Sequence, residues 1–309
     1  MNSCLRIRLG TRRSALARWQ ADWIAARLVQ LGAEVIQVFI TTAGDRRQRE
    51  PIGQLGGRGL FTREIQRALL TGRIDLAVHS LKDLPTEEVT GLCLAASPER
   101  ASVADVLVCR QHGCLEELPD GAVVGTGSLR RRAQLLHLRS DLRTKDVRGN
   151  VDTRLRKLAQ GDYDALVLAE AGLRRLDLLA EPDSAGADCA RSVARRALAG
   201  KKGEPLGPFP VVLLEPPLFL PAVGQGALGL EVRTDDQRTR HFVEQLNHLA
   251  TWASVLAERA MLASLRGGCL APIAAWGRVE KGQLVVCLLY TSDAADDLLC
   301  VDLGGRRII

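Results

Sequence analysis

The chain has 309 residues, of which 46% are hydrophobic and 25% charged, and its formal net charge is +6. This balance is typical of a soluble globular protein of two or three domains and excludes disordered, collagen-like and coiled-coil chains. The basic side chains are almost all arginine, which favours bidentate contacts to carboxylates or phosphates. Composition alone therefore allows either nucleic acid or a small acidic molecule as the partner.

The eight cysteines are scattered, with no CxxC pair and no neighbouring histidine cluster, so we expect no metal site. Such scattering in a long chain is typical of reduced thiols in a cytoplasmic protein. The N-terminus lacks the apolar core of a signal peptide, and the least charged stretch, 209–230, contains prolines and Glu215. We therefore expect a cytoplasmic protein without a membrane span.

The N-terminal third alternates between strand and helix patterns. An apolar–basic alternation and a Gly-Thr-Arg turn precede a segment with helical spacing, and a glycine-rich loop precedes the next helix. This order predicts right-handed crossovers and a largely parallel sheet. The expected elements are strands at 5–9, 34–40 and 74–79, helices from the turn at 10–14 to 31 and at 61–71, and the loop at 42–59.

The pattern repeats after a crossing segment at 85–102, which predicts a second α/β unit. Residues 181–217 are rich in Ala, Arg, Gly and Pro and are interpreted as an insertion, helical near 189–198. The remaining expected elements are strands at 105–109, 122–124, 144–147, 165–168, 227–232, 273–279 and 284–287, and helices at 128–138, 151–160, 235–247 and 250–265.

The C-terminal stretch departs from the rest of the chain. Residues 287–297, CLLYTSDAADD, resemble the translation of a transposase adapter used in preparing DNA libraries. We therefore expect the natural sequence to end near Val286 and the tail from about 287 to be artefactual. The alternative is a genuine but divergent C-terminus, and resequencing the locus by an adapter-free method decides between the two.

A carboxylate follows the third predicted strand, in the run HSLKDLP. Residues just past the carboxyl end of a parallel strand are where α/β proteins bind ligands. Asp83, flanked by Lys82, would then face a cleft. The alternative is an aspartate that caps a turn before Pro85.

Arginines follow three other predicted strands. In the run VGTGSLRRR, backbone N–H groups are free at a helix N-terminus, where Arg130 and Arg131 oppose the helix dipole unless an anion lies there. Arg148 and Arg154 follow the next strand, and Arg12 follows the first. Together these strand ends predict a polyanionic ligand between two α/β units, with a solvated basic face as the alternative. Nucleic acid is disfavoured because no aromatic residues are interleaved.

Cys269 follows two glycines in the run LRGGCLAPI, on a predicted loop after a helix. A nucleophilic cysteine usually has a histidine or a cation nearby that lowers its pKa. Arg266 is near in sequence and no histidine is. A small buried loop residue is therefore the alternative.

Together and in this order, the motifs resemble the porphobilinogen deaminase (hydroxymethylbilane synthase) family. They are TRRSALA, GGRGLFTREI, DLAVHSLKDLP, GTGSLRRRAQL, VRGNVDTRL, PAVGQGALGLE and AERAMLASLRGGCLAPI, and the likeness runs from about residue 5 to 286 apart from the insertion. The resemblance implies a transferase of tetrapyrrole (haem and chlorophyll) biosynthesis. It would polymerise four porphobilinogen molecules onto a Cys-linked dipyrromethane primer, with loss of ammonia, and release linear hydroxymethylbilane by hydrolysis.

The resemblance also assigns residues. Cys269 matches the cysteine that holds the dipyrromethane cofactor through a thioether, and Asp83 matches the catalytic aspartate. The cofactor-binding matches are Lys82, Thr126, Ser128, Arg130, Arg131 and Arg154, and the substrate-binding matches are Arg12, Ser14, Arg58, Arg148, Arg175 and Gln225. No metal is implied. Each pyrrole ring carries an acetate and a propionate, which would explain the arginines as carboxylate partners.

The implied fold is α/β, with two lobes like those of periplasmic binding proteins and a small C-terminal α+β domain that we expect to be incomplete. The expected domains are 1–98 plus 221–245, which carries Asp83; 99–220, with the insertion at 181–217; and 246–309, which carries Cys269. We expect a monomer that passes its product to uroporphyrinogen-III synthase and contacts neither nucleic acid nor membrane.

Two other functions are open on the sequence alone. A non-catalytic two-lobed binder of an anionic small molecule explains the arginines but not Asp83 together with Cys269. A basic nucleic-acid-binding protein lacks any recognised motif in this chain.

Overall fold

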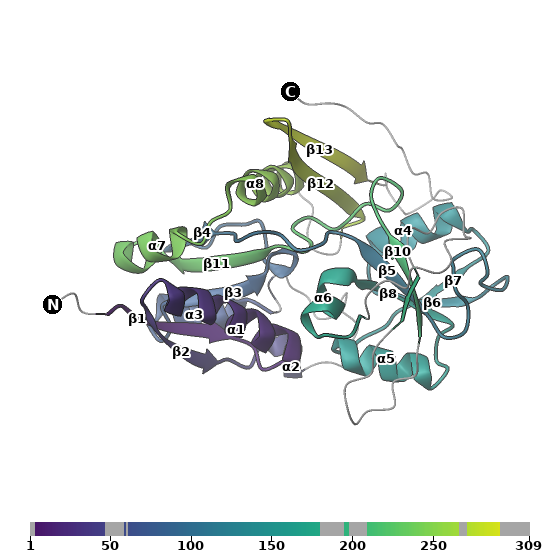
Figure 1. Ribbon diagram of the computed structural model, residues 1–309, viewed down its shortest axis with the longest axis horizontal. Coiled ribbons are helices and arrows are strands. Elements are labelled where there is room, and N and C mark those ends of the chain that lie inside the picture. The colour runs from purple at the N-terminus through teal and green to yellow at the C-terminus, as the bar shows by residue number, and fades with distance from the viewer. Residues whose placement is uncertain are drawn as a thin grey trace.

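Three β-sheets organise the chain into two lobes and a smaller third unit (Figure 1). The five-stranded sheet forms lobe 1, the six-stranded sheet forms lobe 2, and a two-stranded hairpin packs on one long helix in the third unit. The structure is a computed structural model, and it describes residues 4–46, 59, 61–179, 195–197, 209–265 and 271–290.

Lobe 1 has the strand order β2-β1-β3-β11-β4, and helices α1 and α3 pack against β1 and β3. Strand β1 is parallel to β2 and β3, whereas β11 is antiparallel to β3 and β4. Ser14 caps α1, because its side chain accepts a hydrogen bond from the Ala17 amide. The bounds are β1 (Arg6–Thr11), α1 (Ala15–Gln30), β2 (Glu34–Phe39), α2 (Ala43–Arg46), α3 (Arg63–Leu70), β3 (Leu76–Ser80), β4 (Leu92–Ala96), β11 (Leu228–Arg233) and α7 (Gln237–Glu244).

Lobe 2 has the strand order β7-β6-β8-β5-β10-β9. Its central strand β5 is buried on both faces: Val106 and Val108 belong to one core cluster, and Leu107 and Cys109 to another. This alternation explains why β5 is an uninterrupted apolar run after its first residue, Asp105. The bounds are β5 (Asp105–Cys109), β6 (Val123–Gly125), α4 (Leu129–Leu138), β7 (Arg143–Lys145), α5 (Val151–Ala159), β8 (Ala165–Ala169), α6 (Glu170–Arg175), β9 (Arg195–Ala197) and β10 (Pro210–Leu214).

The parallel pairing expected for the three N-terminal strands is confirmed, since β1 is parallel to both β2 and β3, but neither sheet is parallel throughout. In lobe 1 β11 runs antiparallel to both of its neighbours, and in lobe 2 β5, β8, β9 and β10 form antiparallel pairs. In lobe 1 the reversed strand is β11, by which the chain returns from lobe 2, and in lobe 2 it is β5, by which the chain enters, since β5 runs opposite to β8 and β10. Strand periodicity carries no information about strand direction, and the sequence could not reveal this pairing.

Two segments contain strands that the sequence analysis did not expect. Strand β4 lies within the predicted crossing segment 85–102, and β10 lies within the predicted insertion 181–217. Residues 195–197, expected to be helical, form β9, while 181–194 and 198–208 lie outside the described residues. The prolines around Val211–Leu214 hid a short, fully buried strand that has no period of its own. The exact domain boundaries stay predictions.

Two crossing segments, 97–104 and 215–227, join the lobes and pack against each other. Arg100 Nε donates to the Gln225 carbonyl oxygen at 2.8 Å, and the Ala101 amide donates to the Gly226 oxygen at 3.3 Å. Gly226 has a φ of +82°, and a Cβ atom there would lie 2.5 Å from the Ala101 oxygen. Only glycine allows the two crossing segments to pack this closely at position 226, so the segments are held together by direct backbone contacts.

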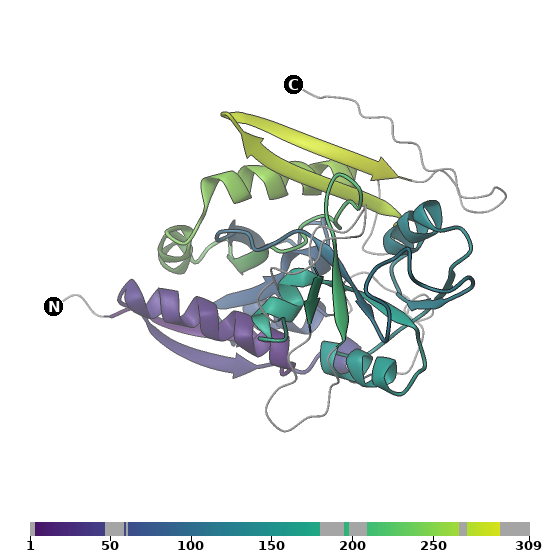
Figure 2. The ribbon, with the colours of Figure 1, turned by 45° about the vertical axis from the view of Figure 1, so that its right-hand side comes forward.

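The third unit consists of α8 (Leu249–Ser264) packed on β12 (Ile273–Glu280), which pairs with β13 (Gln283–Tyr290) (Figure 2). Glu258 on α8 is fully buried. Its carboxylate accepts hydrogen bonds from Arg100 Nη1 at 2.6 Å and from the Gly224 and Gly277 amides, each at 2.7 Å. One carboxylate therefore joins both crossing segments to the helix and the hairpin of the third unit.

Residues 287–290, expected to lie beyond the natural end of the sequence, continue β13. They pair with residues 273–276 of β12, and Leu289 packs with Leu220 and Ala274 in a small buried cluster. The described structure thus shows no break at Val286. Residues 291–309 lie outside the described part of the chain.

Replacing Glu258 tests this junction. Glu258→Ala leaves the Arg100 guanidinium and two amides without their buried partner, so we expect it to lower the free energy of unfolding by about 3–5 kcal/mol. Glu244→Ala is the matched control, because its i,i+4 pair with Arg240 is exposed, and it should cost only about 0.3–0.5 kcal/mol. Urea denaturation measures both, and equal effects would contradict the assigned role.

Candidate active site

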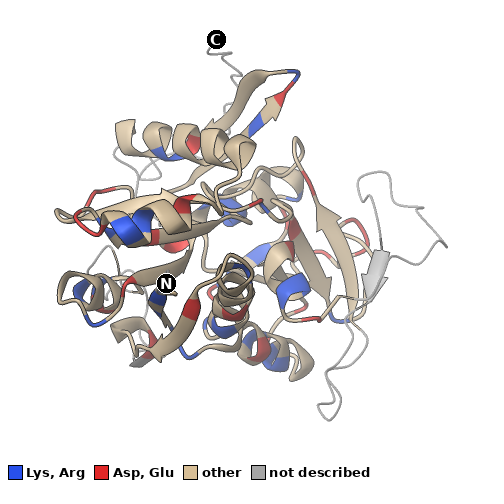
Figure 3. Cartoon of the chain, turned by 60° about the vertical axis from the view of Figure 1, so that its left-hand side comes forward, with Lys and Arg blue, Asp and Glu red and all other residues tan. Residues whose placement is uncertain are grey.

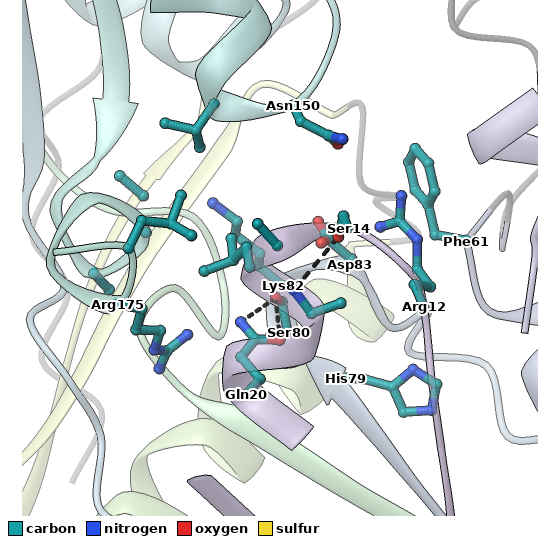
Figure 4. A pocket seen from close by; sticks show the side chains of 18 of the residues that line it. Arg12, Ser14, Gln20, Phe61, His79, Ser80, Lys82, Asp83, Asn150 and Arg175 are labelled. Carbon is teal, nitrogen blue, oxygen red and sulfur yellow. Dashed lines mark hydrogen bonds between the residues drawn. The ribbon is translucent and has the colours of Figure 1, made fainter. Parts of the chain in front are cut away.

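A cleft of about 320 Å³ lies between the lobes, and side chains from both lobes line it (Figure 4). Five of the described lining residues carry cationic side chains and two carry carboxylates. The cations are Arg12, Lys82, Arg131, Arg154 and Arg175, and the carboxylates are Asp83 and Asp152. This excess of positive charge suits a ligand that bears several carboxylates.

Asp83 lies at the carboxyl edge of the lobe 1 sheet. It ends the short 3₁₀ helix Leu81–Asp83, which directly follows the buried strand β3. Within the described part of the chain, the Asp83 carboxylate makes no hydrogen bond and no ion pair. Its position past the end of β3 agrees with the sequence-based expectation, and its oxygens are available to a ligand.

Lys82 precedes Asp83 in the same turn and also lines the cleft. Burial, together with the nearby charge of Arg131, lowers the pKa of Lys82 to about 8, although Asp83 and Asp105 favour its charged form. The ammonium group is thus held in a place that penalises its charge. A negatively charged ligand group would relieve that penalty.

Arg12 follows β1, as expected, and its guanidinium is already paired within the protein. Its Nε and Nη2 atoms donate to the Asp45 carboxylate, and the Phe61 ring lies 4.3 Å from the guanidinium carbon. Burial raises the pKa of the Asp45 carboxyl, but the Arg12 guanidinium and the Thr42 donors outweigh it and hold the pKa below its usual value. Asp45 therefore stands where a ligand carboxylate could bind Arg12.

Arg130 and Arg131 both bind one buried carboxylate, that of Asp105. Arg130 Nη2 and Arg131 Nη2 each donate to it at 2.7 Å, and Gln225 Nε2 donates at 2.9 Å. The Asp105 side chain is fully buried, and despite the opposing effect of that burial the two guanidiniums hold its pKa far below the usual range. Arg131 lines the cleft, whereas Arg130 is covered by protein.

Arg154 and Arg175 keep most of their hydrogen-bond donors free of partners in the part of the chain that the structure describes. Arg154 Nε donates to the Gly149 oxygen at 2.8 Å, and Arg175 Nη2 donates to the Gly226 oxygen at 2.6 Å. Burial lowers the pKa of each to about 10, with a further contribution from Arg131 at Arg154. Both are still charged at neutral pH, and neither meets a carboxylate of the described residues.

The structure does not bring every predicted site residue to the cleft. Thr126, Ser128, Arg130, Arg148 and Gln225 are not among the described lining residues, whereas Ser14 is. Ser128 caps α4 by accepting from the Arg131 amide, and Thr126 Oγ1 accepts from the Ser128 amide at 3.2 Å. These two therefore build the turn that carries Arg131. Cys269 and Arg58 lie outside the described residues.

Sequence reasoning missed several polar residues at the cleft. Gln20 on α1 and Ser80 at the end of β3 exchange hydrogen bonds across the cleft wall, as Figure 4 shows. His79 Nε2 lies 3.0 Å from a carboxylate oxygen of the buried Glu231. A polar residue inside an apolar strand, as in LAVHS, is the signal that could have indicated the pair of His79 and Glu231.

The described residues include no group of His, Cys, Asp and Glu side chains arranged to hold a metal ion. They also include no helix with both the length and the apolarity that a membrane span needs. The expectation of reduced thiols holds for four described cysteines, Cys4, Cys93, Cys109 and Cys287, but Cys114 is disulfide-bonded.

Comparison with known proteins gives consistent family matches. The model of the porphobilinogen deaminase dipyrromethane cofactor binding domain matches residues 7–241, and that of the porphobilinogen deaminase C-terminal domain matches 252–297. The porphobilinogen deaminase of Maridesulfovibrio salexigens is 44% identical over 281 residues, covering 90% of this chain and 82% of that one. That of Shouchella clausii is 45% identical over 301 residues, covering 95% and 87%.

Among solved structures, the aliphatic sulphonate binding protein SsuA of Escherichia coli is 15% identical, with a TM-score of 0.40 over 85% of this chain and 76% of that one. The arginine-specific periplasmic binding protein STM4351 of Salmonella typhimurium is 13% identical, also with a TM-score of 0.40, over 85% and 98%. Likenesses at this level carry no argument, and the two-lobed α/β description is based on the sheets themselves.

The strained position of Lys82 leads to a stability prediction. The folded state holds its pKa near 8 against 10.5 for the free side chain, so it disfavours the charged form. Lys82→Met should therefore raise the free energy of unfolding at pH 7 by on the order of 1–3 kcal/mol. The wild-type protein gains stability as the pH rises from about 8 to about 10.5, because Lys82 then loses its proton in the folded state. The difference in unfolding free energy between Lys82→Met and the wild type should therefore become smaller over this pH range.

Urea denaturation at pH 7 and at pH 10 measures this difference. Lys157→Met is the control, because Lys157 lies on α5 outside the cleft, and it should change stability by less than about 0.5 kcal/mol. A wild-type protein more stable than Lys82→Met at pH 7 would contradict the assignment.

Proposed function

Since the chain belongs to the porphobilinogen deaminase family, we propose that the interlobe cleft is its active site and that Asp83 is the catalytic carboxylate. The protein is a transferase, a hydroxymethylbilane synthase of tetrapyrrole biosynthesis. It joins four porphobilinogen molecules head to tail, with loss of one ammonia from each, and releases the linear tetrapyrrole after hydrolysis.

One observation carries the proposal: among the described residues, the Asp83 carboxylate has no partner and lies in a cleft lined by five cationic side chains from two lobes. Loss of ammonia from porphobilinogen leaves positive charge on the substrate, which the arginines would repel and a carboxylate would stabilise. At 4 Å and an effective dielectric constant of 20, one such pair gains about 4 kcal/mol. The same carboxylate can take the proton that the substrate nitrogen or carbon must lose.

The cationic side chains can bind the carboxylate groups of the substrate. Porphobilinogen carries an acetate and a propionate, and guanidinium groups bind carboxylates through two parallel hydrogen bonds. Arg175, which donates to the Gly226 oxygen, and Arg12, which is paired to Asp45, lie on either side of Asp83 in Figure 4. We propose that these two, with Ser14, orient the substrate, and that Arg58 and Arg148 assist them.

The cleft residues also fit the dipyrromethane cofactor of the family. Its carboxylates match the donor chemistry of Lys82, Arg131 and Arg154, and the buried Nε atom of Arg131 has no partner in the described structure. When bound, the cofactor supplies the pyrrole carbon to which the first substrate unit is joined. We propose that Cys269 holds it through a thioether and that Thr126, Ser128, Arg130 and Gln225 support Arg131 from behind.

The cellular location, the oligomeric state and the enzyme that receives the product are also proposals. We propose a cytoplasmic monomer that passes its product to uroporphyrinogen-III synthase. Lys and Arg are interspersed with Asp and Glu over both lobes (Figure 3), which does not favour a nucleic-acid surface. The alternative of a non-catalytic two-lobed binder is not favoured, because the family matches span most of the chain.

Replacing Asp83 tests the catalytic assignment. Asp83→Asn keeps the shape and the hydrogen-bonding capacity but loses the charge, so we expect a folded protein whose kcat falls on the order of 10²–10³-fold. Asp141→Asn is the control, since Asp141 pairs with Arg139 away from the cleft, and it should keep kcat within about twofold. Near-normal formation of hydroxymethylbilane by Asp83→Asn would remove the carboxylate from the mechanism.

Intact mass tests the attachment residue. The purified wild-type protein should exceed its sequence mass by one dipyrromethane unit, and Cys269→Ser should not. Cys4→Ser, which changes an exposed free thiol, should keep the added mass. Added mass on Cys269→Ser would show that another residue holds the cofactor.

A further inference from the structure

We infer that Asp105, a residue to which no role is assigned, is a positioning residue of the active site that acts through Arg131 and Lys82. The inference rests on the proposed function of the cleft. It concerns a carboxylate that is fully buried and is not among the described residues that line the cleft, so its effect must pass through the cations beside it.

The geometry leaves Arg131 little freedom. Its Nη2 atom donates to Asp105 Oδ1 at 2.7 Å, and its Nη1 atom donates to the Val167 oxygen at 3.0 Å. Both terminal nitrogens are thus bound by protein, while the side chain still lines the cleft. The remaining N–H groups, among them the buried and unpartnered Nε–H, are those that Arg131 can offer to an anion.

Asp105 also orders the groups behind Arg131. Arg130 Nη2 occupies its second oxygen, and Gln225 Nε2 donates to the same oxygen as Arg131. Gln225 additionally donates to the Val103 oxygen of a crossing segment at 2.7 Å. The position of the Asp105 carboxylate is therefore set by lobe 2 and by both segments that join the lobes.

The charge of Asp105 matters as much as its position. Lys82 faces Arg130 and Arg131, which disfavour its ammonium form, and Asp83 and Asp105, which favour it. Removal of the Asp105 charge would leave two guanidiniums opposed by Asp83 alone. Lys82 would then lose its proton at lower pH and hold a ligand carboxylate less well.

The chain contains a matched comparison in Asp75. Its carboxylate also binds two guanidiniums, Arg8 Nη2 at 2.7 Å and Arg233 Nη2 at 3.1 Å. Asp75 precedes β3, at the opposite end of that strand from Asp83, and is not among the described residues that line the cleft. Comparing variants of Asp75 and Asp105 therefore separates the general loss of stability on breaking an Arg–Asp–Arg cluster from a specific effect on the active site.

The experiment measures steady-state formation of hydroxymethylbilane from porphobilinogen by the cofactor-loaded wild-type protein, Asp105→Asn, Asp105→Glu and Asp75→Asn, from pH 6.5 to 9. We expect Asp105→Asn to raise KM for porphobilinogen on the order of tenfold while kcat changes less than about threefold, because Arg131 and Lys82 would hold the cofactor carboxylates less firmly and the acceptor that the substrate must meet would be less ordered. We expect the wild-type KM to rise at alkaline pH as Lys82 loses its proton, and in Asp105→Asn this rise should begin at lower pH. Asp105→Glu, which keeps the charge but is one methylene longer, should raise KM with the alkaline rise unmoved.

Asp75→Asn should lower stability to thermal unfolding and leave both KM and its pH profile unchanged. In an Arg131→Gln background, the Asp105 substitutions should raise KM by less than about twofold, because Asp105 acts through that arginine. If Asp105→Asn does not fold, the Asp105→Glu variant and this background still decide the matter.

A wild-type KM and pH profile in folded Asp105 variants, or an equal rise of KM in Asp75→Asn, would overturn the inference. A wild-type protein that forms no hydroxymethylbilane would instead overturn the proposed function, so the two failures are distinguishable.

Discussion

The crowding of cations in a partly buried cleft is the constraint on which the site depends. Five cationic side chains of the described residues converge there, and desolvation lowers the pKa of three of them, Lys82, Arg154 and Arg175. Such a cluster repels itself unless carboxylates are placed within it. Asp105 and Asp45 each neutralise part of it from within the protein, while Asp83 has no ion-pair partner among the residues that the structure describes. Some charged side chains of the site are therefore paired within the protein, and others are left to bind the ligand.

The connections between the lobes serve both structure and site. The crossing segments carry Gln225 and Gly226, which bind Asp105 and Arg175 respectively, and they are fastened to the third unit by Arg100 and Glu258. A movement of one lobe against the other must therefore pass through residues that hold the cleft cations. The same residues therefore join the two lobes and hold the cleft cations in place.

Much of the architecture could be predicted from sequence because it depends on local signals. Helix α1 begins after a capping serine, Ser14, and the cleft residues Asp83, Arg12 and Arg154 follow predicted strands. What could not be predicted depends on pairings across long separations. Asp105 meets Gln225 over 120 residues, and no local pattern shows which arginines the protein uses itself. Strand β10 was missed for a different reason: it is buried on both faces, so its sequence shows no alternation of apolar and polar residues.

The placement of β11 has a consequence for synthesis of the chain. This strand lies between β3 and β4 in the lobe 1 sheet, yet it follows all strands of lobe 2 in sequence. As the polypeptide leaves the ribosome, the facing edges of β3 and β4 stay bare until residues 228–233 emerge, whereas lobe 2 is encoded without interruption. Lobe 2, although synthesised later, can thus complete its sheet first. Until β11 is synthesised, lobe 1 exposes strand edges at which aggregation or chaperone binding can occur.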